Sequence, residues 1–433
     1  MFPTINKLLQ NRPTLTKILA NTGWLFLDKI LRMGLGLLVG IWTTRYLGPE
    51  QFGLLGYSTS FAALFGAIAT LGLDAIVIRE LVKFPEKQDE FLGSAFWLKL
   101  FGGVITLILT IVAIWFVRKG DMMTLWLVAI SAASFIFQSL NVIDFYFQAL
   151  LKSRYTVYAA NGAFLITTVY KIFLLLNKGS LIAFAWTSFF EIALTALFLI
   201  VAYHKSQQNI WKWKFNTKIA YNFLKDSWPL VFSSIAITIY MKIDQVMIGD
   251  LSNNMEVGFY AVAARLSELG FFVPMIVLSS IYPKLIELFN KDETLYTKQL
   301  QKVMGLFFWG WLTLSIIVFI FSEKIILLMF GKTFLPSAPI LTVHIFSGII
   351  VSMGVIFSNR FLLKNQQIIG LYGTIVGAVA NILLNFILIP KYGGVGAAWA
   401  TLISYIVPPA FQSIFFDFEI ARIHFRSIYK FYG

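Results

Sequence analysis

Cysteine is absent from this chain of 433 residues, and it contains only three histidines. The absence of cysteine excludes a disulfide framework, a thiol nucleophile and thiolate metal sites, although it does not identify a compartment. The histidines lie far apart in the sequence, with no pair at the spacing of metal ligands, so each is interpreted as a packing residue: His204, His344 and His424. We therefore expect no metal centre and no bound cofactor.

Charge is also scarce. Charged residues make up 13% of the chain and hydrophobic residues 58%, against about 25% and about 45–50% in ordinary globular chains. Two or three soluble domains, which this length would otherwise suggest, cannot be covered with so little polar surface. Hydrolytic and nucleotide-binding motifs are missing as well: there is no HExxH, no GxSxG with triad partners and no Walker lysine loop. These absences predict a membrane protein that is not an enzyme.

What the chain does contain is a series of apolar runs, each long enough to cross a hydrocarbon core of about 30 Å. They predict an all-α polytopic membrane protein with about twelve transmembrane helices: 22–44, 52–74, 94–117, 122–148, 157–176, 180–203, 228–249, 258–282, 303–322, 338–361, 368–389 and 394–418. A further apolar run at 325–335 is too short to span and is interpreted as a re-entrant or interfacial piece.

The basic residues predict the orientation. With the N-terminus inside, 22 of the 35 Lys and Arg fall in inner segments, 7 in outer segments and 6 within the spans. Such a bias places both termini in the cytoplasm of a multi-pass plasma (inner) membrane protein, with membrane lipids as partners. The net charge of +14 is then a topology signal, and a nucleic-acid partner is not expected.

The longest inner loop, 204–227, interleaves tryptophan and phenylalanine with lysine. Two interpretations are open: a platform for single-stranded nucleic acid, or an amphipathic helix at an anionic inner leaflet, which we favour. The loop divides the chain into its predicted parts: a cytoplasmic segment 1–21, an N-lobe 22–203, the linker helix 204–227, a C-lobe 228–418 and a basic cytoplasmic tail 419–433.

The two lobes resemble each other. When Trp24 is aligned with Trp228, QFGLLGY (51–57) falls beside EVGFYAV (256–262), and FAWTS (184–188) resembles AAWAT (397–401). Six spans in each lobe give both repeats the same orientation. The fold class is therefore two six-helix lobes related by a pseudo-two-fold axis along the membrane normal.

Ionisable residues inside spans are the best functional candidates, because each costs at least about 2.5–3.5 kcal/mol at the bilayer centre unless it faces a cavity or a partner. Isolated candidates near span ends are Lys99, Asp144, Lys171 and Glu191. The densest sets lie in spans one, seven and eight: Asp28, Lys29 and Arg32; Lys242 and Asp244; Arg265 and Glu268.

The spacing of these charges leaves two interpretations. Asp28 and Arg32 can pair at i,i+4, and so can Arg265 and Glu268 at i,i+3, which would make them structural salt bridges. Alternatively the set lines a water-filled cationic cavity suited to a phosphate group, which we favour, because packing alone needs no such charges.

Short motifs in order along the chain resemble one known family. The first half contributes RYLGPEQFG (45–53), GLD (72–74) and RE (79–80). The second half contributes WPLVFSS (228–234), DQVMIG (244–249), VGFYAVAARL (257–266) and GVGAAWATLISY (394–405). Together they resemble the Wzx-type polysaccharide flippases of the multidrug/oligosaccharidyl-lipid/polysaccharide exporter superfamily, over nearly the whole chain.

The resemblance implies a flippase that moves an undecaprenyl-pyrophosphate-linked oligosaccharide from the inner to the outer leaflet by alternating access. By this analogy Lys29, Arg32, Lys242 and Arg265 would bind the pyrophosphate and sugar. Proton or sodium coupling would fall to Asp28, Asp244 or Glu268, and the gate or family-motif residues would be Arg45, Pro49, Asp74, Arg79 and Glu80. A polysaccharide polymerase and a chain-length regulator would be its protein partners.

Two other functions stay open. A multidrug or small-molecule cation antiporter of the same superfamily would favour an aromatic, carboxylate-bearing cavity over a cationic one. A non-transporting membrane scaffold of a polysaccharide-synthesis complex would need no interior charge.

Overall fold

The computed structural model describes Pro13–Tyr429, with side chains from Arg32 onward except at positions 279, 280 and 283. Within that part of the chain all regular structure is helical and no strand occurs. The chain divides into two compact units, which are described separately. Unit 1 comprises Met1–Tyr46 and Phe61–Ile235, and unit 2 comprises Leu47–Ser60 and Ala236–Gly433. The lobe limits at 203 and 228 stay a prediction.

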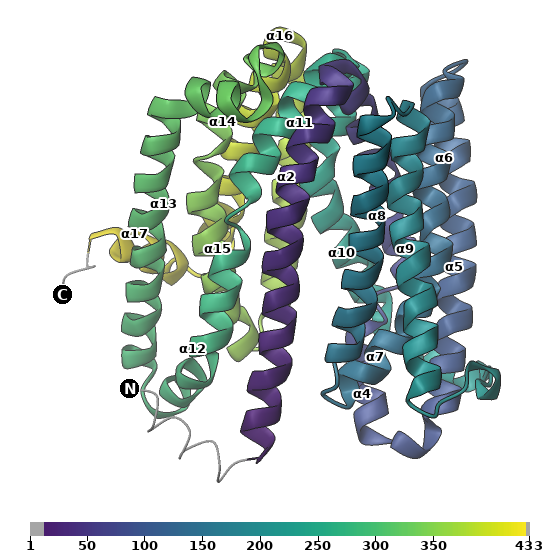
Figure 1. Cartoon of the computed structure of the whole chain (residues 1–433). Helices are drawn as coiled ribbons and strands as arrows, with labels where there is room; N and C mark the ends of the chain where they lie inside the picture. Colours follow the sequence, from purple (N-terminus) through teal and green to yellow (C-terminus); the bar gives the residue numbers. More distant parts are fainter. Residues whose placement is uncertain (1–12, 430–433) are drawn as a thin grey trace, which may run out of the picture. The chain divides into compact units, whose positions relative to one another are not determined.

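The helices of unit 1 are joined by short turns, and neighbours in sequence run side by side, as α5 with α6 and α8 with α9 (Figure 1). Its elements are α2 (Pro13–Leu64, shared with unit 2), α3 (Gly66–Thr70), α4 (Asp74–Lys83), η1 (Pro85–Lys87), α5 (Gln88–Val117), α6 (Met122–Phe137), η2 (Gln138–Asn141), α7 (Val142–Ala149), α8 (Arg154–Leu176), α9 (Leu181–Lys205), η3 (Ile210–Lys212) and the first part of α10 (Thr217–Leu251).

Unit 2 contains the second part of α2, the rest of α10 and the helices that follow. These are α11 (Asn254–Glu268), α12 (Phe272–Lys291), α13 (Glu293–Phe330), η4 (Lys332–Phe334), α14 (Ser337–His344), α15 (Ser347–Leu363), α16 (Gln367–Phe415) and α17 (Glu419–Tyr429). The predicted re-entrant piece at 325–335 is wrong. Residues 325–330 continue α13, because nothing before Gly331, which has a φ of 87°, interrupts the helix.

Two long helices are each two spans joined at a glycine. Gly48 has a φ of 70° inside α2 and Gly393 a φ of 55° inside α16. Glycine adopts this left-handed backbone without steric penalty, and Pro49 then supplies the fixed φ suited to the first turn of the next helix. The break at Gly48 and Pro49 lies between the predicted spans 22–44 and 52–74.

The number of spans follows from these breaks. Within the described residues, nine helices are long and apolar enough to cross a membrane, and the bent pair Arg32–Leu64 with Gly66–Lys83 makes ten. Splitting α2 at Gly48 and α16 at Gly393 raises the ten to twelve. The predicted all-α fold with twelve spans is confirmed.

The same two spans are interrupted in each repeat. In the first repeat, span two breaks between α3 and α4, and span four breaks at η2. In the second repeat, span eight breaks between α11 and α12, and span ten breaks between α14 and α15. Breaks at corresponding positions support the predicted duplication, and discontinuous helices are typical of transporters built from repeats.

Within unit 2, the matched glycines of the two repeats touch. A Cβ atom added to Gly53 would lie 1.8 Å from the carbonyl oxygen of Asn254, and one added to Gly258 would lie 2.0 Å from the carbonyl oxygen of Pro49. Only glycine lets the two backbones approach so closely. The start of span two therefore crosses α11 at a backbone-to-backbone contact.

Replacing Gly53 by Ala is expected to destabilise the protein by about 1–3 kcal/mol, the usual penalty for overpacking. Thermal unfolding of purified protein in detergent measures the change. Gly310→Ala is the matched control: no atom lies within 4 Å of its added Cβ, so its better helix propensity makes it neutral or stabilising by up to about 1 kcal/mol. Equal melting temperatures for the two variants would contradict the close crossing.

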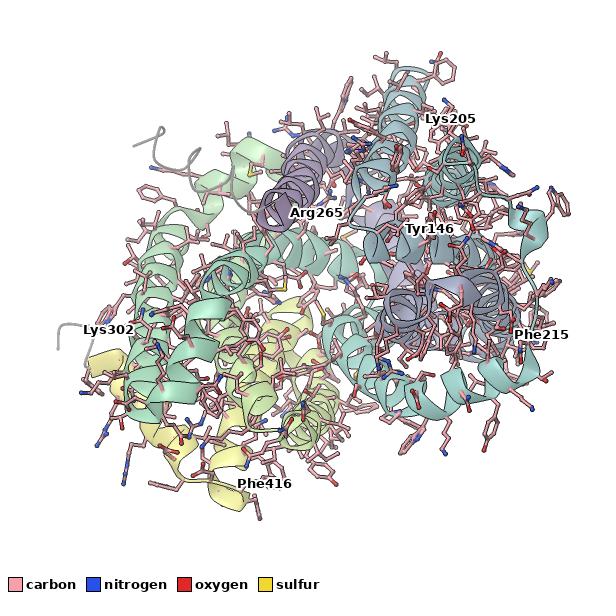
Figure 2. The ribbon with its side chains drawn as sticks, turned by 90° about the horizontal axis from the view of Figure 1, so that it is seen from below. Tyr146, Lys205, Phe215, Arg265, Lys302 and Phe416 are labelled. Carbon is pink, nitrogen blue, oxygen red and sulfur yellow. The ribbon has the colours of Figure 1, made fainter. Side chains whose placement is uncertain are left out.

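The segment 204–227 does not form the single amphipathic helix that we predicted. Lys205 ends α9, η3 is one short turn, residues 213–216 are non-helical, and α10 begins at Thr217. Tertiary contacts hold this segment out of a helix, because Trp213 donates its indole N–H to the hydroxyl of Tyr203 at 3.2 Å and packs against Phe96. Phe215 lies on this segment at the periphery of unit 1 (Figure 2).

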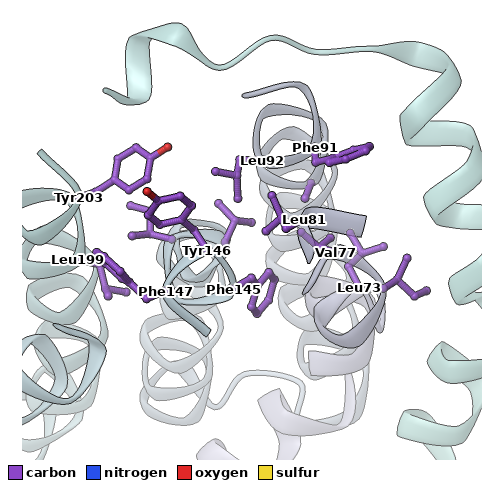
Figure 3. Packing of buried hydrophobic residues seen from close by; sticks show 14 of the residues in the cluster. Leu73, Val77, Leu81, Phe91, Leu92, Phe145, Tyr146, Phe147, Leu199 and Tyr203 are labelled. Atoms are coloured by element: carbon purple, nitrogen blue, oxygen red, sulfur yellow. The ribbon is translucent and has the colours of Figure 1, made fainter. Parts of the chain in front are cut away.

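Beneath that segment lies the apolar core of unit 1, shown in Figure 3. Leu73, Val77, Leu92 and Phe147 have no measurable exposure there. They come from α4 and its N-cap residue, α5 and α7, so the short helices of the broken spans two and four are fixed by core packing. This core positions the polar residues of α4, α5 and α7.

Candidate functional site

Unit 1 holds an ion cluster formed by α2, α8 and α9. Arg32 donates to the carbonyl oxygen of Ala160 at 2.6 Å and to the carboxylate of Glu191 at 3.4 Å. The ammonium of Lys171 lies 3.8 Å from the other oxygen of Glu191. Two basic side chains thus share one carboxylate among the described residues, which we call the unit 1 cluster.

The unit 1 cluster is partly open. The side chains of Arg32, Lys171 and Glu191 are 30%, 24% and 22% exposed. The guanidinium of Arg32 also lies 5.3 Å from the ring centroid of Phe164, a cation–π contact that orients it. A partly exposed arginine side chain with a fixed orientation is suited to contact an anionic group that enters the cluster.

Of the predicted residues in span one, the structure thus describes Arg32 only. The side chains of Asp28 and Lys29 lie outside the described residues, so their predicted roles stay predictions. Lys171 and Glu191 had been placed near span ends as lesser candidates, and the structure brings both of them to Arg32.

Unit 2 holds a second site around Asp244 on α10, which is 3% exposed. Its carboxylate accepts three hydrogen bonds, from the hydroxyls of Tyr260 at 2.7 Å and Thr401 at 2.6 Å and from the amide of Asn385 at 2.6 Å. All three donors are neutral, so no described ion pair balances the buried charge. We call these four residues the Asp244 site.

Two further buried polar atoms adjoin the Asp244 site. The side-chain oxygen of Asn385 and the side-chain nitrogen of Asn381 have no hydrogen-bond partner among the described residues, although the amide of Asn385 bonds to Asn381 at 3.2 Å. The unpaired side-chain oxygen of Asn385 lies beside the carboxylate of Asp244. Together these oxygen atoms form surroundings that suit a small cation or a proton.

Three other predicted residues lie on spans seven and eight: Lys242, Arg265 and Glu268. Glu268 interacts electrostatically with both Lys242 and Asp244. Arg265 is exposed on α11, one turn before Glu268 (Figure 2). His344, interpreted as a packing residue, is buried against Tyr260 and bonds to the hydroxyl of Ser267 at 2.6 Å.

The family-motif residues take positions at span ends. Asp74, at the start of α4, lies 3.4 Å from the ammonium of Lys99, which is 3% exposed and lies 4.6 Å from the ring centroid of Phe145. Arg79 pairs with Glu80 and with Asp226, both at 2.8 Å. Pro49 is buried and Arg45 is exposed. These contacts fix α4 to α5 and α10.

Sequence reasoning missed Tyr260, Asn381, Asn385 and Thr401, because neutral polar residues are common in membrane helices. One signal was available: Asn381 and Asn385 are spaced i,i+4, which places two amides on one face of span eleven. Nothing in the sequence linked that face to Asp244, which lies 141 residues from Asn385.

The family model described as "Polysaccharide biosynthesis protein" matches residues 18–289, which is more than half of the chain. The chain belongs to this polysaccharide biosynthesis protein family. The resemblance seen in the short motifs is thereby confirmed, and this member of the family is a multi-pass membrane protein.

Two curated proteins are similar in sequence to this family member. One is the "Probable low-salt glycan biosynthesis flippase Agl15" of Haloferax volcanii, 30% identical over 196 residues, which cover 44% of this chain and 40% of that protein. The other is the "Capsular polysaccharide biosynthesis protein CapF" of Staphylococcus aureus, 20% identical over 406 residues, covering 89% of this chain and 96% of that protein. The first match thus spans less than half the length of its relative.

Solved structures share the fold of this family member. The lipid II flippase MurJ in an inward closed conformation superposes with a TM-score of 0.73 at 16% identity, over 96% of this chain and 92% of that one. An inward-facing multidrug resistance MATE family transporter superposes with a TM-score of 0.69 at 16% identity, over 90% and 95%. The predicted two-lobed helical fold is confirmed by these likenesses.

Proposed function

We propose that the protein is a flippase that moves an undecaprenyl-pyrophosphate-linked oligosaccharide from the cytoplasmic to the outer leaflet of the plasma membrane. Membership of the polysaccharide biosynthesis family carries the proposal. The unit 1 cluster supplies the chemistry: Arg32 and Lys171 are basic, partly exposed and share one carboxylate. An arginine fork binds phosphate oxygens in pairs, which suits a pyrophosphate head group.

The membrane positions make a structural role alone a poor explanation for this cluster. Charged side chains within spans are rare unless they face a bundle interior or a water-filled cavity. Arg32 and Lys171 both lie inside long apolar helices, α2 and α8, and both keep about a quarter or more of their side chain exposed. In the proposed mechanism the head group enters a cationic cavity while the lipid tail stays in the bilayer. The positive-inside bias predicts that both termini lie in the cytoplasm.

Energy coupling is assigned by the proposal to the Asp244 site. A buried carboxylate with only neutral donors can exchange its proton or bind Na⁺, because carboxylate, amide and hydroxyl oxygens are the hard ligands that such ions prefer. The ion is cargo: it enters with the gradient, neutralises Asp244 and leaves on the other side. Asp28 and Glu268 are the further coupling candidates, and Glu268 interacts electrostatically with Asp244.

The multidrug antiporter is the second candidate, favoured by the fold shared with the MATE transporter. A flippase for an anionic head group needs basic residues, whereas a carrier of organic cations needs carboxylates and aromatic rings. The basic excess of the unit 1 cluster favours the flippase. A non-transporting scaffold is disfavoured because it would require neither the unit 1 cluster nor the Asp244 site.

Complementation tests the proposal. In a cell lacking its own polysaccharide flippase, the protein is expected to restore surface polysaccharide and to end the accumulation of lipid-linked units on the inner leaflet. Restoration of drug resistance without polysaccharide would support the antiporter instead. A scaffold would be indicated if variants of the unit 1 cluster and of the Asp244 site restored as much polysaccharide as the unaltered chain.

Replacing Arg32 by Ala is expected to lower the amount of surface polysaccharide that the protein restores by about 10- to 100-fold. This corresponds to the loss of a charged hydrogen bond of about 1.5–3 kcal/mol to the head group. Surface polysaccharide per cell, corrected for the amount of protein in the membrane, measures the effect.

Arg154→Ala is the control for this change, because Arg154 is an exposed arginine at the start of α8, outside the cluster. It is expected to complement normally. Normal polysaccharide from Arg32→Ala at equal protein level would remove the unit 1 cluster from the mechanism.

A further inference from the structure

After the last span of the first repeat, the chain folds back across the start of α5. The backbone N–H of Lys214 donates to the carbonyl oxygen of Asp89 at 3.1 Å, and the amide of Asn216 donates to the carboxylate of Glu90 at 2.6 Å. Gly93 permits this approach, since an added Cβ would lie 2.5 Å from the carbonyl oxygen of Lys214. The backbone of residues 209–216 is therefore held in a fixed position.

The side chains that point away from this fixed segment are aromatic and basic. Trp211 is 85% exposed and Phe215 48% exposed, and the lysines between and after them are exposed as well. Phe215 is labelled in Figure 2. We call this set the linker surface: Trp211, Lys212, Lys214, Phe215 and Lys218.

After the last span of the second repeat, α17 folds back in the same way. It packs against α13, the counterpart of α5 as third span of its repeat (Figure 1). Arg360, which is 2% exposed, bonds to Glu419 at the start of α17 and lies 3.6 Å from Glu293 at the start of α13. Trp309 donates to the carbonyl oxygen of Ile428 at 3.2 Å.

The buried face of α17 is apolar. Ile420 and Ile423 are 2% and 1% exposed, and His424 packs against Phe357 with 4.7 Å between ring centroids. Burial lowers the pKa of His424, so this ring is neutral at physiological pH and suited to its apolar contact.

The opposite face of α17 repeats the character of the linker surface. Phe418, Phe425 and Tyr429 are 71%, 64% and 81% exposed, and Arg422 and Arg426 are exposed beside them. Positions 418, 422, 425 and 429 follow the spacing of one helical face. We call these five residues the tail surface.

From these observations we propose that the linker surface and the tail surface are membrane-interface anchors that bind the headgroups of anionic phospholipids. Each ends a repeat, each is fixed to the third span of that repeat, and each presents large aromatic side chains beside basic ones. Six spans lie between them, so both surfaces lie on the same side of the membrane. Aromatic rings favour the headgroup level, and basic residues near an anionic leaflet are attracted to it.

The pairing of two such elements distinguishes this proposal from a nucleic-acid platform. A platform would need one continuous surface of stacked aromatics along a groove, whereas here the elements belong to separate repeats. Each places its apolar contacts toward its own unit and its charged aromatic face outward. The proposal does not depend on which substrate the protein moves.

Because the chain has no cysteine, single fluorescent labels test the proposal directly. Phe215→Cys and Phe425→Cys are each labelled with an environment-sensitive dye, and the full chain is placed in nanodiscs of phosphatidylcholine with rising fractions of phosphatidylglycerol. Blue-shifted emission and stronger quenching by spin-labelled lipid are expected at both positions as phosphatidylglycerol rises. Lys119→Cys, in the turn between α5 and α6 at the opposite end of span three, is the control and is expected not to respond.

Removing the positive charges of the linker surface shows whether the dye response comes from headgroup binding or only from the proximity of this surface to the bilayer. Changing Lys212, Lys214 and Lys218 together to Gln is expected to weaken the phosphatidylglycerol response at position 215 by about fivefold per lysine, or about a hundredfold in all. The response at position 425 should stay unchanged. Inorganic phosphate is expected to have no effect.

Three results would overturn the proposal. One is a dye response at position 215 that is the same in phosphatidylcholine and phosphatidylglycerol. Another is a response that survives removal of the lysines. The third is a blue shift of the dyes that occurs in cell membranes and is absent in nanodiscs, which would indicate that a protein partner covers these positions in place of lipid.

Discussion

Replacing Asp244 by Asn is expected to abolish ion-driven transport and leave only the rate seen without a gradient. The side chain keeps its size, and the hydroxyls of Tyr260 and Thr401 can still donate to the new amide oxygen, so the fold should be retained. The charge that binds the coupling ion is lost. Transport measured in liposomes with an imposed proton or sodium gradient checks this result and shows which ion is used.

Two further variants test the role of the Asp244 site. Thr401→Val removes one of the oxygen atoms around Asp244, and is expected to raise the ion concentration needed for half-maximal transport by about 10- to 100-fold. Glu323→Gln changes an exposed carboxylate on α13, outside the site, and should behave as the unaltered chain. Full gradient dependence in Asp244→Asn would contradict the assignment and direct attention to Glu268 or Asp28.

A disulfide between positions 56 and 261 is expected to stop transport completely and reversibly. A Cβ atom at Gly56 would lie 3.8 Å from the Cβ of Ala261, within the range of about 3.5–4.5 Å that disulfides require. Both positions lie near the outer ends of their spans in the proposed topology, and we expect the contact between them to open when substrate is released to the outer leaflet. In Gly56→Cys/Ala261→Cys the bond would hold this contact closed.

The absence of native cysteine makes the measurement clean. Transport is compared before oxidation, after oxidation and after reduction, with each single-cysteine variant treated identically as a control. The double variant should lose activity only when oxidised and regain it on reduction. Undiminished transport by the fully cross-linked protein would show that the start of span two and α11 do not separate during the cycle.

The sequence was informative where local chemistry decides structure. The break at Gly48–Pro49 and the lengths of the spans follow from backbone preferences and hydrophobic patterning, and both can be predicted without a partner. The family resemblance rested on the same local motifs. These parts of the fold needed no knowledge of what lies beside them.

Contacts between distant residues could not be predicted in this way. Trp213 overrides the helical pattern of 204–227 by packing against Tyr203 and Phe96. Glu191 and Lys171 were noted only as lesser candidates, although they complete the cluster of Arg32. Asp244 was selected as an ionisable residue in a span, but its neutral partners are recruited from α11 and α16 by the fold.

Leaflet exchange in liposomes is the most direct test of the central claim. The purified protein is reconstituted with a lipid-linked oligosaccharide confined to the inner leaflet, and an impermeant lectin reports how much reaches the outer leaflet. The proposal predicts that exchange exceeds that of protein-free liposomes, rises with an ion gradient and is lost in Arg32→Ala. Exchange equal to protein-free liposomes, under either gradient and with the protein shown to be folded, would contradict the claim that this protein is a flippase.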